Sequence, residues 1–151
     1  MRVIKPENVH CKDFIKLIKR FEQEGIDEGI QFGFNYDDLE KTYYGWIQSQ
    51  PGLMLEHNGE IIGCIAGIVV PFLANYSTLY CLEHIWYVVP EYRDKGGGIR
   101  LLRTFEKVLK EMGVKKLIMA HSLTFKARYF RRLYKRLGYK PLEAQYIKDI
   151  L

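Results

Sequence analysis

The apolar residues of this chain recur with two different periods, which predict alternating helices and strands. From Phe14 to Phe21 and from Leu101 to Met112 they return every three or four positions, as on one face of an amphipathic helix. Elsewhere they form short runs rich in β-branched and aromatic residues, which are typical of strands. Asn58-Gly59 separates two such runs and predicts a type I′ hairpin turn. The pattern therefore predicts a mixed α/β chain.

Taken in chain order, the pattern predicts ten or eleven elements in one domain of residues 1–151. They are a strand at Arg2–Lys5, a helix from Asn8 to Gly25, a loop at Ile26–Asn35, a helix from Asp37 to Pro51, strands at Leu53–Glu56 and Ile61–Val70, a turn at Pro71–Ser77, a strand at Thr78–Val89, a helix at Gly98–Met112, a strand at Val114–Ala120, a helix from Phe125 or Lys126 to Leu137, and one or two closing strands in Tyr139–Leu151. Gly113 and Gly138 stand where a helix C′ glycine is expected. The run Ile61–Val70 is apolar enough for a central strand.

Composition narrows the class of protein. The chain has 151 residues, of which 48% are hydrophobic, so it should fold around a core. Its three cysteines lie far apart without metal-type spacing, so we expect reduced thiols, no metal and a cytoplasmic protein. Met1–Val9 has no apolar signal region, and the longest apolar run, Ile61–Leu73, is too short to span a bilayer. We therefore expect no membrane association.

The net charge of +5 is unevenly distributed. All seven charged residues from Glu22 to Glu40 are acidic, and all seven from Lys126 to Lys140 are basic. The first segment could attract a cation and the second a polyanion, although both could equally be ordinary solvated faces. Charge alone leaves these alternatives open.

A glycine-rich turn, Lys95-Gly96-Gly97-Gly98, joins the strand Thr78–Val89 to the following helix. Glycine lets the backbone approach a ligand closely, and the first turn of a helix offers unpaired N–H groups and the positive end of the dipole. This arrangement predicts a phosphate site. A Walker A loop is excluded, because it requires Lys and then Ser or Thr after its last glycine, and this chain has Ile99 and Arg100 there. The dinucleotide-binding fingerprint does not fit either, because its third glycine or small residue is replaced by Leu101.

The pattern that does fit is Arg-x-x-Gly-x-Gly at Arg93, Gly96 and Gly98, preceded by Val88-Val89-Pro90-Glu91-Tyr92. Together these residues resemble the acyl-CoA pyrophosphate loop of the GNAT-type N-acetyltransferases. The order of predicted elements is also similar to that family over essentially the whole chain. The resemblance implies the GNAT fold, an α/β sandwich with a central mixed, mostly antiparallel sheet and about four helices.

The resemblance further implies transfer of an acetyl group from acetyl-CoA to a primary amine. The backbone of Trp86, Tyr87 and Val88 would then hold pantetheine and the thioester. The backbone amides that would hold the pyrophosphate are those of Arg93, Asp94, Lys95, Gly96, Gly97, Gly98 and Ile99.

Such a transfer needs a base to deprotonate the amine and an acid to protonate the leaving thiolate. Glu83 is the first candidate base, since it is the only carboxylate between Glu60 and Glu91 and partial burial would raise its pKa. His84 is the alternative, and in a regular strand it faces away from Glu83. Leu133-Tyr134-Lys135-Arg136-Leu137-Gly138 resembles the family segment that carries the acid, which assigns that role to Tyr134.

Other features bear on partners. The family often has an Asn shortly before the tyrosine that acts as general acid, and this Asn contacts pantetheine. Lys126–Arg132 contains no Asn, so Arg131, Arg132 and Lys135 could contact CoA phosphates instead.

A non-catalytic acyl-CoA-binding or partner-docking GNAT module is the alternative function. Nucleic acid binding through Arg128–Arg132 is not expected, since an amphipathic helix gives the same pattern. The acidic Glu22–Glu40 segment favours an amine of a cationic small molecule or of a protein or peptide, and a homodimer is left open.

Overall fold

The structure, a computed structural model, describes residues 1–27, 33–123, 126–146, 148 and 150. The chain forms two compact units, residues 1–120 and 121–151, and the prediction of one domain remains a prediction. The first unit contains β1 (Arg2–Ile4), the 3₁₀ helix η1 (Asn8–His10), α1 (Cys11–Asp27), α2 (Tyr36–Ser49), β2 (Gly52–His57), β3 (Glu60–Phe72), β4 (Asn75–Val88), the 3₁₀ helix η2 (Pro90–Lys95), α3 (Gly97–Glu111) and β5 (Val114–Ile118), and the second contains α4 (Ala127–Arg136).

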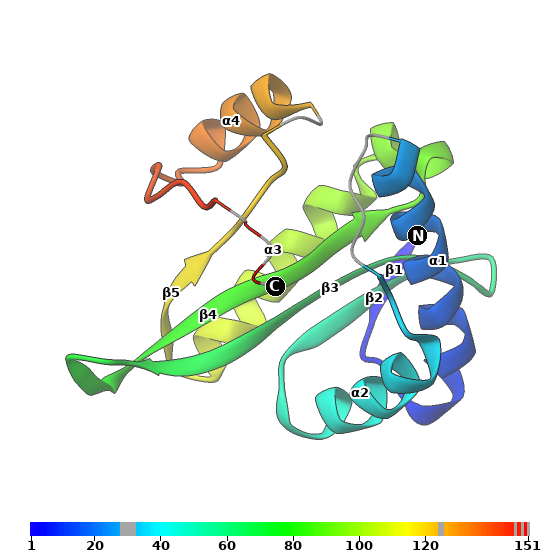
Figure 1. The fold of residues 1–151 in the computed structure, drawn as a ribbon, viewed down its shortest axis with the longest axis horizontal. Coiled ribbons are helices and arrows are strands. Elements are labelled where there is room, and N and C mark those ends of the chain that lie inside the picture. The colour runs from blue at the N-terminus through cyan, green and yellow to red at the C-terminus, as the bar shows by residue number, and fades with distance from the viewer. Residues whose placement is uncertain (28–32, 124–125, 147, 149, 151) are drawn as a thin grey trace. The chain divides into compact units, whose positions relative to one another are not determined.

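The five strands form one sheet in the order β1-β2-β3-β4-β5, with β3 at its centre as its apolar sequence predicts (Figure 1). The first four strands pair antiparallel, and β5 joins β4 in parallel. The sheet is therefore mixed and mostly antiparallel, which confirms the predicted fold class. Asn58 and Gly59 both have positive φ, 52° and 82°, which confirms the predicted type I′ turn between β2 and β3.

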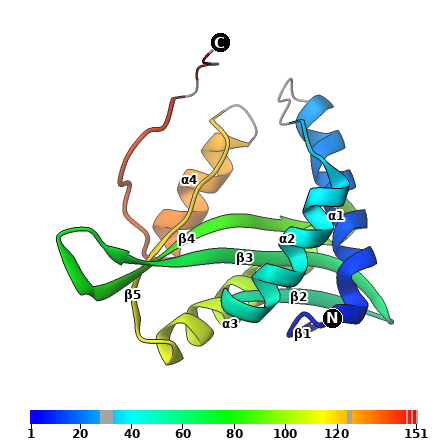
Figure 2. The same cartoon turned by 60° about the horizontal axis from the view of Figure 1, so that its bottom comes forward.

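Helices cover both faces of this sheet. α1 and α2 lie over one face, and α3 lies against the other (Figures 1 and 2). Of the α3 side chains that the helical period selects, Leu101, Leu102, Phe105 and Leu109 are buried and Val108 is half-buried, whereas Met112, expected to face inward, is 43% exposed just after the helix ends. The largest fully buried side chains include Leu17 of α1 and Tyr43 of α2 as well as Leu101, Leu102 and Phe105 of α3.

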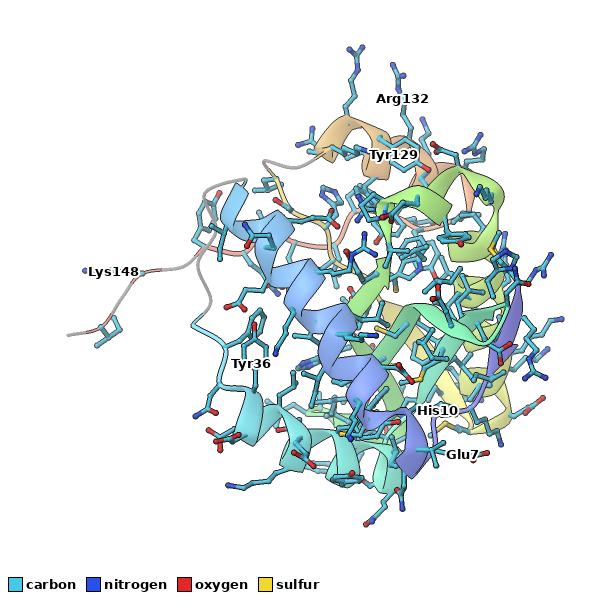
Figure 3. All side chains as sticks on the ribbon, turned by 90° about the vertical axis from the view of Figure 1, so that its right-hand side faces the viewer. Glu7, His10, Tyr36, Tyr129, Arg132 and Lys148 are labelled. Carbon is cyan, nitrogen blue, oxygen red and sulfur yellow. The ribbon has the colours of Figure 1, made fainter. Side chains whose placement is uncertain are left out.

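Several predicted boundaries need correction. α1 continues through Gly25 to Asp27, because a glycine stops a helix only when the backbone there turns to positive φ, and this one stays helical. Asn8 does not cap α1. It begins η1, whose entry is fixed by an N–H of Glu7 that donates to Nδ1 of His10 at 3.0 Å (Figure 3). The turn between β3 and β4 is also tighter than predicted, since the two strands extend to Phe72 and Asn75.

The second unit confirms one expectation and overturns another. Gly138 has φ 90° after α4, as predicted for a C′ glycine. No strand forms among residues 139–146, 148 and 150, where closing strands were predicted. Leu142 and Tyr146 are 69% and 94% exposed, so this segment has no buried apolar face for a sheet to cover. Positions 28–32 of the predicted loop, a helix start at Phe125, and residues 147, 149 and 151 lie outside the described residues.

Candidate active site

The strand β4 loses its neighbour on one side halfway along its length. β4 pairs with β3 almost throughout, from Asn75 to Val88, but its pairing with β5 covers only Leu79 to Leu82. Within the described residues, no strand accompanies β4 on the β5 side between Glu83 and Val88. Figure 1 shows the two strands diverging. A strand edge of this kind can pair with an extended ligand, and Trp86, Tyr87 and Val88, predicted to hold pantetheine, lie on it.

A β-bulge interrupts β4 at the start of this open edge. Ile85 lies opposite Ala66 and Glu83 lies opposite Gly67, so His84 is the extra residue. Gly67 is required there, because a Cβ would lie 2.6 Å from Sγ of Cys81 and 2.7 Å from the carbonyl oxygen of Leu82. A bulge redirects side chains, and the strict alternation expected of Glu83 and His84 therefore does not apply.

Glu83 has the environment of a carboxyl that titrates near neutrality. Its side chain is half-buried, and burial raises its pKa to about 7, although Oε2 accepts a hydrogen bond from the N–H of Ala120 at 3.1 Å. Ala120 follows β5, so the carboxyl lies where β4 and β5 separate. The neighbouring thiols of Cys64 and Cys81 are fully buried, and burial raises their pKa values to about 12 and about 11. Of these three groups, the carboxyl is the one suited to proton transfer.

The glycine turn forms the other end of the candidate site. The chain leaves β4, passes through η2, turns at Gly96 with φ 76° and enters α3 at Gly97. A Cβ on Gly97 would lie 2.6 Å from Cδ2 of Leu55, whereas one on Gly98 would make only ordinary contacts with Val88 and Trp86 at 3.7 and 3.8 Å. Gly97 is therefore needed for packing, and Gly98 leaves space above the first amides of α3. These amides suit a phosphate group.

Two ion pairs hold η2 against α1. Arg93 donates through Nε to the carbonyl oxygen of Val88 at 2.8 Å and through Nη2 to both carboxylate oxygens of Glu24 at 2.6 and 2.8 Å. The hydroxyl of Tyr87 donates to the same carboxylate at 2.5 Å. Arg20 pairs with Glu91 at 2.6 Å. The Arg93 side chain is thus engaged within the protein, and the predicted binding of pyrophosphate by its backbone amide remains a prediction.

Sequence reasoning did not find Glu24 as a partner of this turn. It is 69 positions from Arg93, and nothing in its local pattern distinguishes it from the other acidic residues around it. The predicted residues Asp94 and Lys95 are exposed, and Nζ of Lys95 lies 4.5 Å from the ring centre of Tyr92.

Comparison with known proteins decides the family. The model of the acetyltransferase (GNAT) family matches residues 16–139. This chain belongs to the GNAT acetyltransferase family. An uncharacterised N-acetyltransferase of Chlorobaculum tepidum is 33% identical over 91 residues, which are 60% of this chain and 50% of that protein. The chain thus spans about half the length of this curated relative.

Solved structures show the same fold as this GNAT chain. An acetyltransferase of Trypanosoma brucei superposes with a TM-score of 0.76 at 16% identity over 99% of both chains. A predicted acetyltransferase of Clostridium acetobutylicum, solved with acetyl-CoA, superposes with a TM-score of 0.75 at 20% identity over 98% of this chain and 95% of the other. The GNAT fold predicted from the sequence is therefore confirmed.

The second unit of the GNAT chain contains the predicted acid. Tyr134 is 9% exposed on α4, and its ring lies 5.4 Å from that of Tyr139 and 6.0 Å from that of His121 between ring centres. The carbonyl oxygen of Tyr134 accepts the N–H of Tyr139 at 2.9 Å, just after Gly138. The local fold thus fixes the Tyr134 backbone and ring, and its role as acid remains a prediction.

The opposite face of α4 is basic. Arg128, Arg131, Arg132, Lys135 and Arg136 are all exposed, and Figure 3 shows Arg132 pointing away from the helix. Among the described residues, no group of three or more His, Cys, Asp and Glu side chains is placed to hold a metal ion. None of the helices that the structure describes is long and apolar enough to cross a bilayer.

Proposed function

We propose that this GNAT protein is an acetyl-CoA-dependent N-acetyltransferase whose acceptor is a primary amine. The observation that carries the proposal is a carboxyl with a pKa of about 7, that of Glu83, on the strand that leads into the glycine turn. Family membership supports an acetyl transfer, and the amides at the start of α3 fit the pyrophosphate of CoA.

In this mechanism the amine attacks the thioester carbonyl carbon, a C–N bond forms and the C–S bond breaks. Glu83 takes the proton that the amine must lose, directly or through one water molecule, with His84 as the alternative base. The hydroxyl of Tyr134 gives a proton to the departing thiolate. The amides of residues 93–99 hold the pyrophosphate, and the edge of β4 from Trp86 to Val88 holds pantetheine and orients the thioester.

We assign the acceptor side of the proposed active site to α1 and α2. Of the acidic segment Glu22–Glu40, Glu24 is engaged by Arg93, and Glu22 accepts the hydroxyl of Tyr36. Asp37 and Asp38 are exposed at the start of α2, where Nζ of Lys41 lies 3.6 Å from Oδ1 of Asp38, and the two carboxylates could attract a cationic small molecule or a basic peptide.

The test is release of free thiol from acetyl-CoA with a panel of amines, together with calorimetric titration of acetyl-CoA. Binding with turnover supports the proposal. Binding without turnover on polyamines, amino acids, aminoglycosides and peptides would favour a non-catalytic acyl-CoA-binding module, and absence of binding at micromolar concentrations would refute both.

Tyr134→Phe tests the acid. We expect kcat to fall by ~10²–10⁴-fold with little change in the KM for acetyl-CoA, since only a hydroxyl is removed. Tyr139→Phe, on the neighbouring ring, is the matched control and should retain activity. Equal kcat values in both variants and the original protein would show that Tyr134 contributes only to packing.

A further inference from the structure

A pocket of about 340 Å³ lies between α2 and the strands β3 and β4. Its helix side includes the half-buried ring of Trp46, which packs against the buried rings of Phe14 and Tyr43 with ring centres 5.2 to 5.9 Å apart. Its sheet side includes Ile68 and Ile85 and reaches the bulge at His84. All twelve lining residues belong to the described part of the chain, and none of them is Asp, Glu, Lys or Arg.

The polar groups that line this pocket are largely engaged by the protein. The hydroxyl of Tyr43 donates to the carbonyl oxygen of Glu7 at 2.7 Å, and Nε1 of Trp46 donates to that of Pro51 at 3.2 Å. Oε1 of Gln50 accepts the N–H of Val69 at 2.8 Å. The surface left for a ligand is therefore mainly apolar and aromatic, and it would favour an apolar group over a charged one.

Gly45 lies at the rim of the pocket, in the interior of α2, where glycine lowers helix stability relative to alanine. Neither packing nor a positive φ requires glycine at this position, because a Cβ built there would meet no atom within 4 Å. Gly45 is exposed, so the space beside it is open to solvent as well as to the pocket.

The pocket lies beside the proposed base. Gly67, on its sheet side, is paired with Glu83, and His84 and Ile85 are the next two residues of β4. A strand rises about 3.3 Å per residue, so the sheet side of the pocket lies within one or two strand residues of Glu83. Because the carboxyl accepts the N–H of Ala120 on the β5 side of β4, a molecule with an apolar group in the pocket would need a linker that crosses the width of β4 to bring its amine near this carboxyl.

We infer that this pocket binds an apolar, preferably aromatic, group of the acceptor, so that the substrate class is a primary amine a few bonds from such a group. The inference rests on the proposed function and names its acceptor. The same chemistry occurs in free aralkylamines and in the α-amine of a peptide that begins with a large apolar residue. Burial of one such group is worth ~1.5–3 kcal/mol, or about 10- to 150-fold in kcat/KM.

The first experiment compares 2-phenylethylamine with ethylamine, and Phe-Gly-amide with Gly-Gly-amide, in the thiol-release assay. We expect kcat/KM to be at least tenfold higher for 2-phenylethylamine, for the phenylalanyl peptide, or for both, and the larger ratio identifies the source of the group. Equal values within both pairs would overturn the inference while leaving the N-acetyltransferase proposal intact.

The second experiment places a large side chain at the rim of the pocket. Gly45→Leu adds this side chain without a clash and improves helix propensity, so the fold should persist. We expect it to reduce the preference for 2-phenylethylamine over ethylamine about tenfold or more, since the pocket can no longer bury the ring. Gln48→Leu is the matched control, because it adds the same side chain to an exposed position of α2 that does not line the pocket. An unchanged preference in Gly45→Leu would contradict the inference.

A binding measurement decides the question without turnover. Titration of 2-phenylethylamine should change the tryptophan fluorescence, because Trp46 lines the pocket. The change should weaken in Gly45→Leu and persist in Gln48→Leu. If no amine is acetylated and acetyl-CoA does not bind, the proposed function fails. If in addition the fluorescence titration is flat, the pocket inference fails on its own measurement.

Discussion

The two ends of the open edge of β4 are built in different ways. At the end that leads into α3, the glycine turn relies on backbone amides, and the ion pairs Arg93–Glu24 and Arg20–Glu91 fix the segment before it. At the other end, the bulge at His84 opens onto a pocket without formal charge beside a single carboxyl. The first end suits a constant group such as pyrophosphate, and the second suits a variable acceptor.

This difference explains how one fold can keep its acyl donor while its acceptors differ. Backbone amides present the same donors whatever side chains surround them, so the donor end depends on chain path. The acceptor end depends on which side chains line the pocket, and a single substitution there changes its shape or charge. We therefore expect substitutions at the glycine turn to affect acetyl-CoA binding and substitutions at the bulge to affect acceptor choice and proton transfer.

Gly98→Glu should give the largest effect. A carboxylate near the pyrophosphate site opposes it by ~4 kcal/mol at 4 Å and an effective dielectric constant of 20, so acetyl-CoA binding should fall by about 1000-fold or more. The fold should persist, because a Cβ at this position makes only ordinary contacts and an acidic residue in the first turn of a helix is stabilising.

The control for this variant is Gly98→Gln, which adds nearly the same bulk without the charge and should lose less affinity. Calorimetric titration of acetyl-CoA and a thermal melt of each variant provide the measurement. An unchanged dissociation constant for acetyl-CoA in Gly98→Glu would show that the glycine turn is not part of the binding site.

Glu83→Gln should have the second largest effect. We expect kcat to fall about 100-fold, near the lower limit for loss of a general base. The amide preserves the size of the side chain and can still accept the N–H of Ala120, but it cannot take a proton. In the original protein kcat/KM should rise as the pH increases through about 7 and then level off. The variant should lose this dependence. If His84→Ala loses it and Glu83→Gln retains it, His84 is the base.

The same carboxyl makes a prediction about stability. Its pKa in the folded protein, about 7, lies above the ordinary value of 4.5, so the folded state binds the proton more tightly than the unfolded state. The resulting stabilisation is complete below about pH 4.5 and is lost as the pH rises through 7. Relative to Glu83→Gln, the original protein should therefore lose unfolding free energy between pH 5 and 8, which urea titrations at several pH values can measure.

The donor end of the site was largely predictable from the sequence, and the acceptor end was not. The glycine turn is encoded in a dozen consecutive residues, and its strand, glycines and helix are all found in the structure. Glu83 was also recognisable, because an isolated carboxylate in an apolar strand is unusual. Both features are encoded by residues close together in the sequence, so the sequence alone is enough to predict them.

The bulge, the pocket and the Glu24 partnership depend on pairings between distant segments. Gly67 could be read as one of several glycines in an apolar run until its register opposite Glu83 was known. Glu24 was grouped with the other carboxylates of an acidic run, although its oxygens bind Arg93 and Tyr87. The closing strands predicted in Tyr139–Leu151 are not found, since the described residues after Gly138 form none.

Glu24→Gln should give a smaller effect at the donor end. It weakens the charge-assisted contact to Arg93 that holds η2, so we expect the KM for acetyl-CoA to rise about three- to tenfold, after allowance for the partial exposure of both side chains. The value of kcat and the pH profile should change little, because Glu83 is not affected. Glu91→Gln, which breaks the exposed pair with Arg20, is the matched control and should have a weaker effect. A drop in kcat without a change in KM would contradict this positioning role.

The smallest expected effect concerns the charge on the acceptor side. Asp37 and Asp38 are exposed in the first turn of α2, so their attraction for a cationic amine is screened by solvent and salt. The double variant Asp37→Asn/Asp38→Asn should raise the KM for a cationic acceptor by only about twofold at low ionic strength, and this difference should disappear in high salt. Steady-state kinetics at two salt concentrations measure it, with Asp94→Asn at the donor end as the control. If the double variant instead loses tenfold or more while Gly45→Leu changes nothing, charge rather than the apolar pocket selects the acceptor.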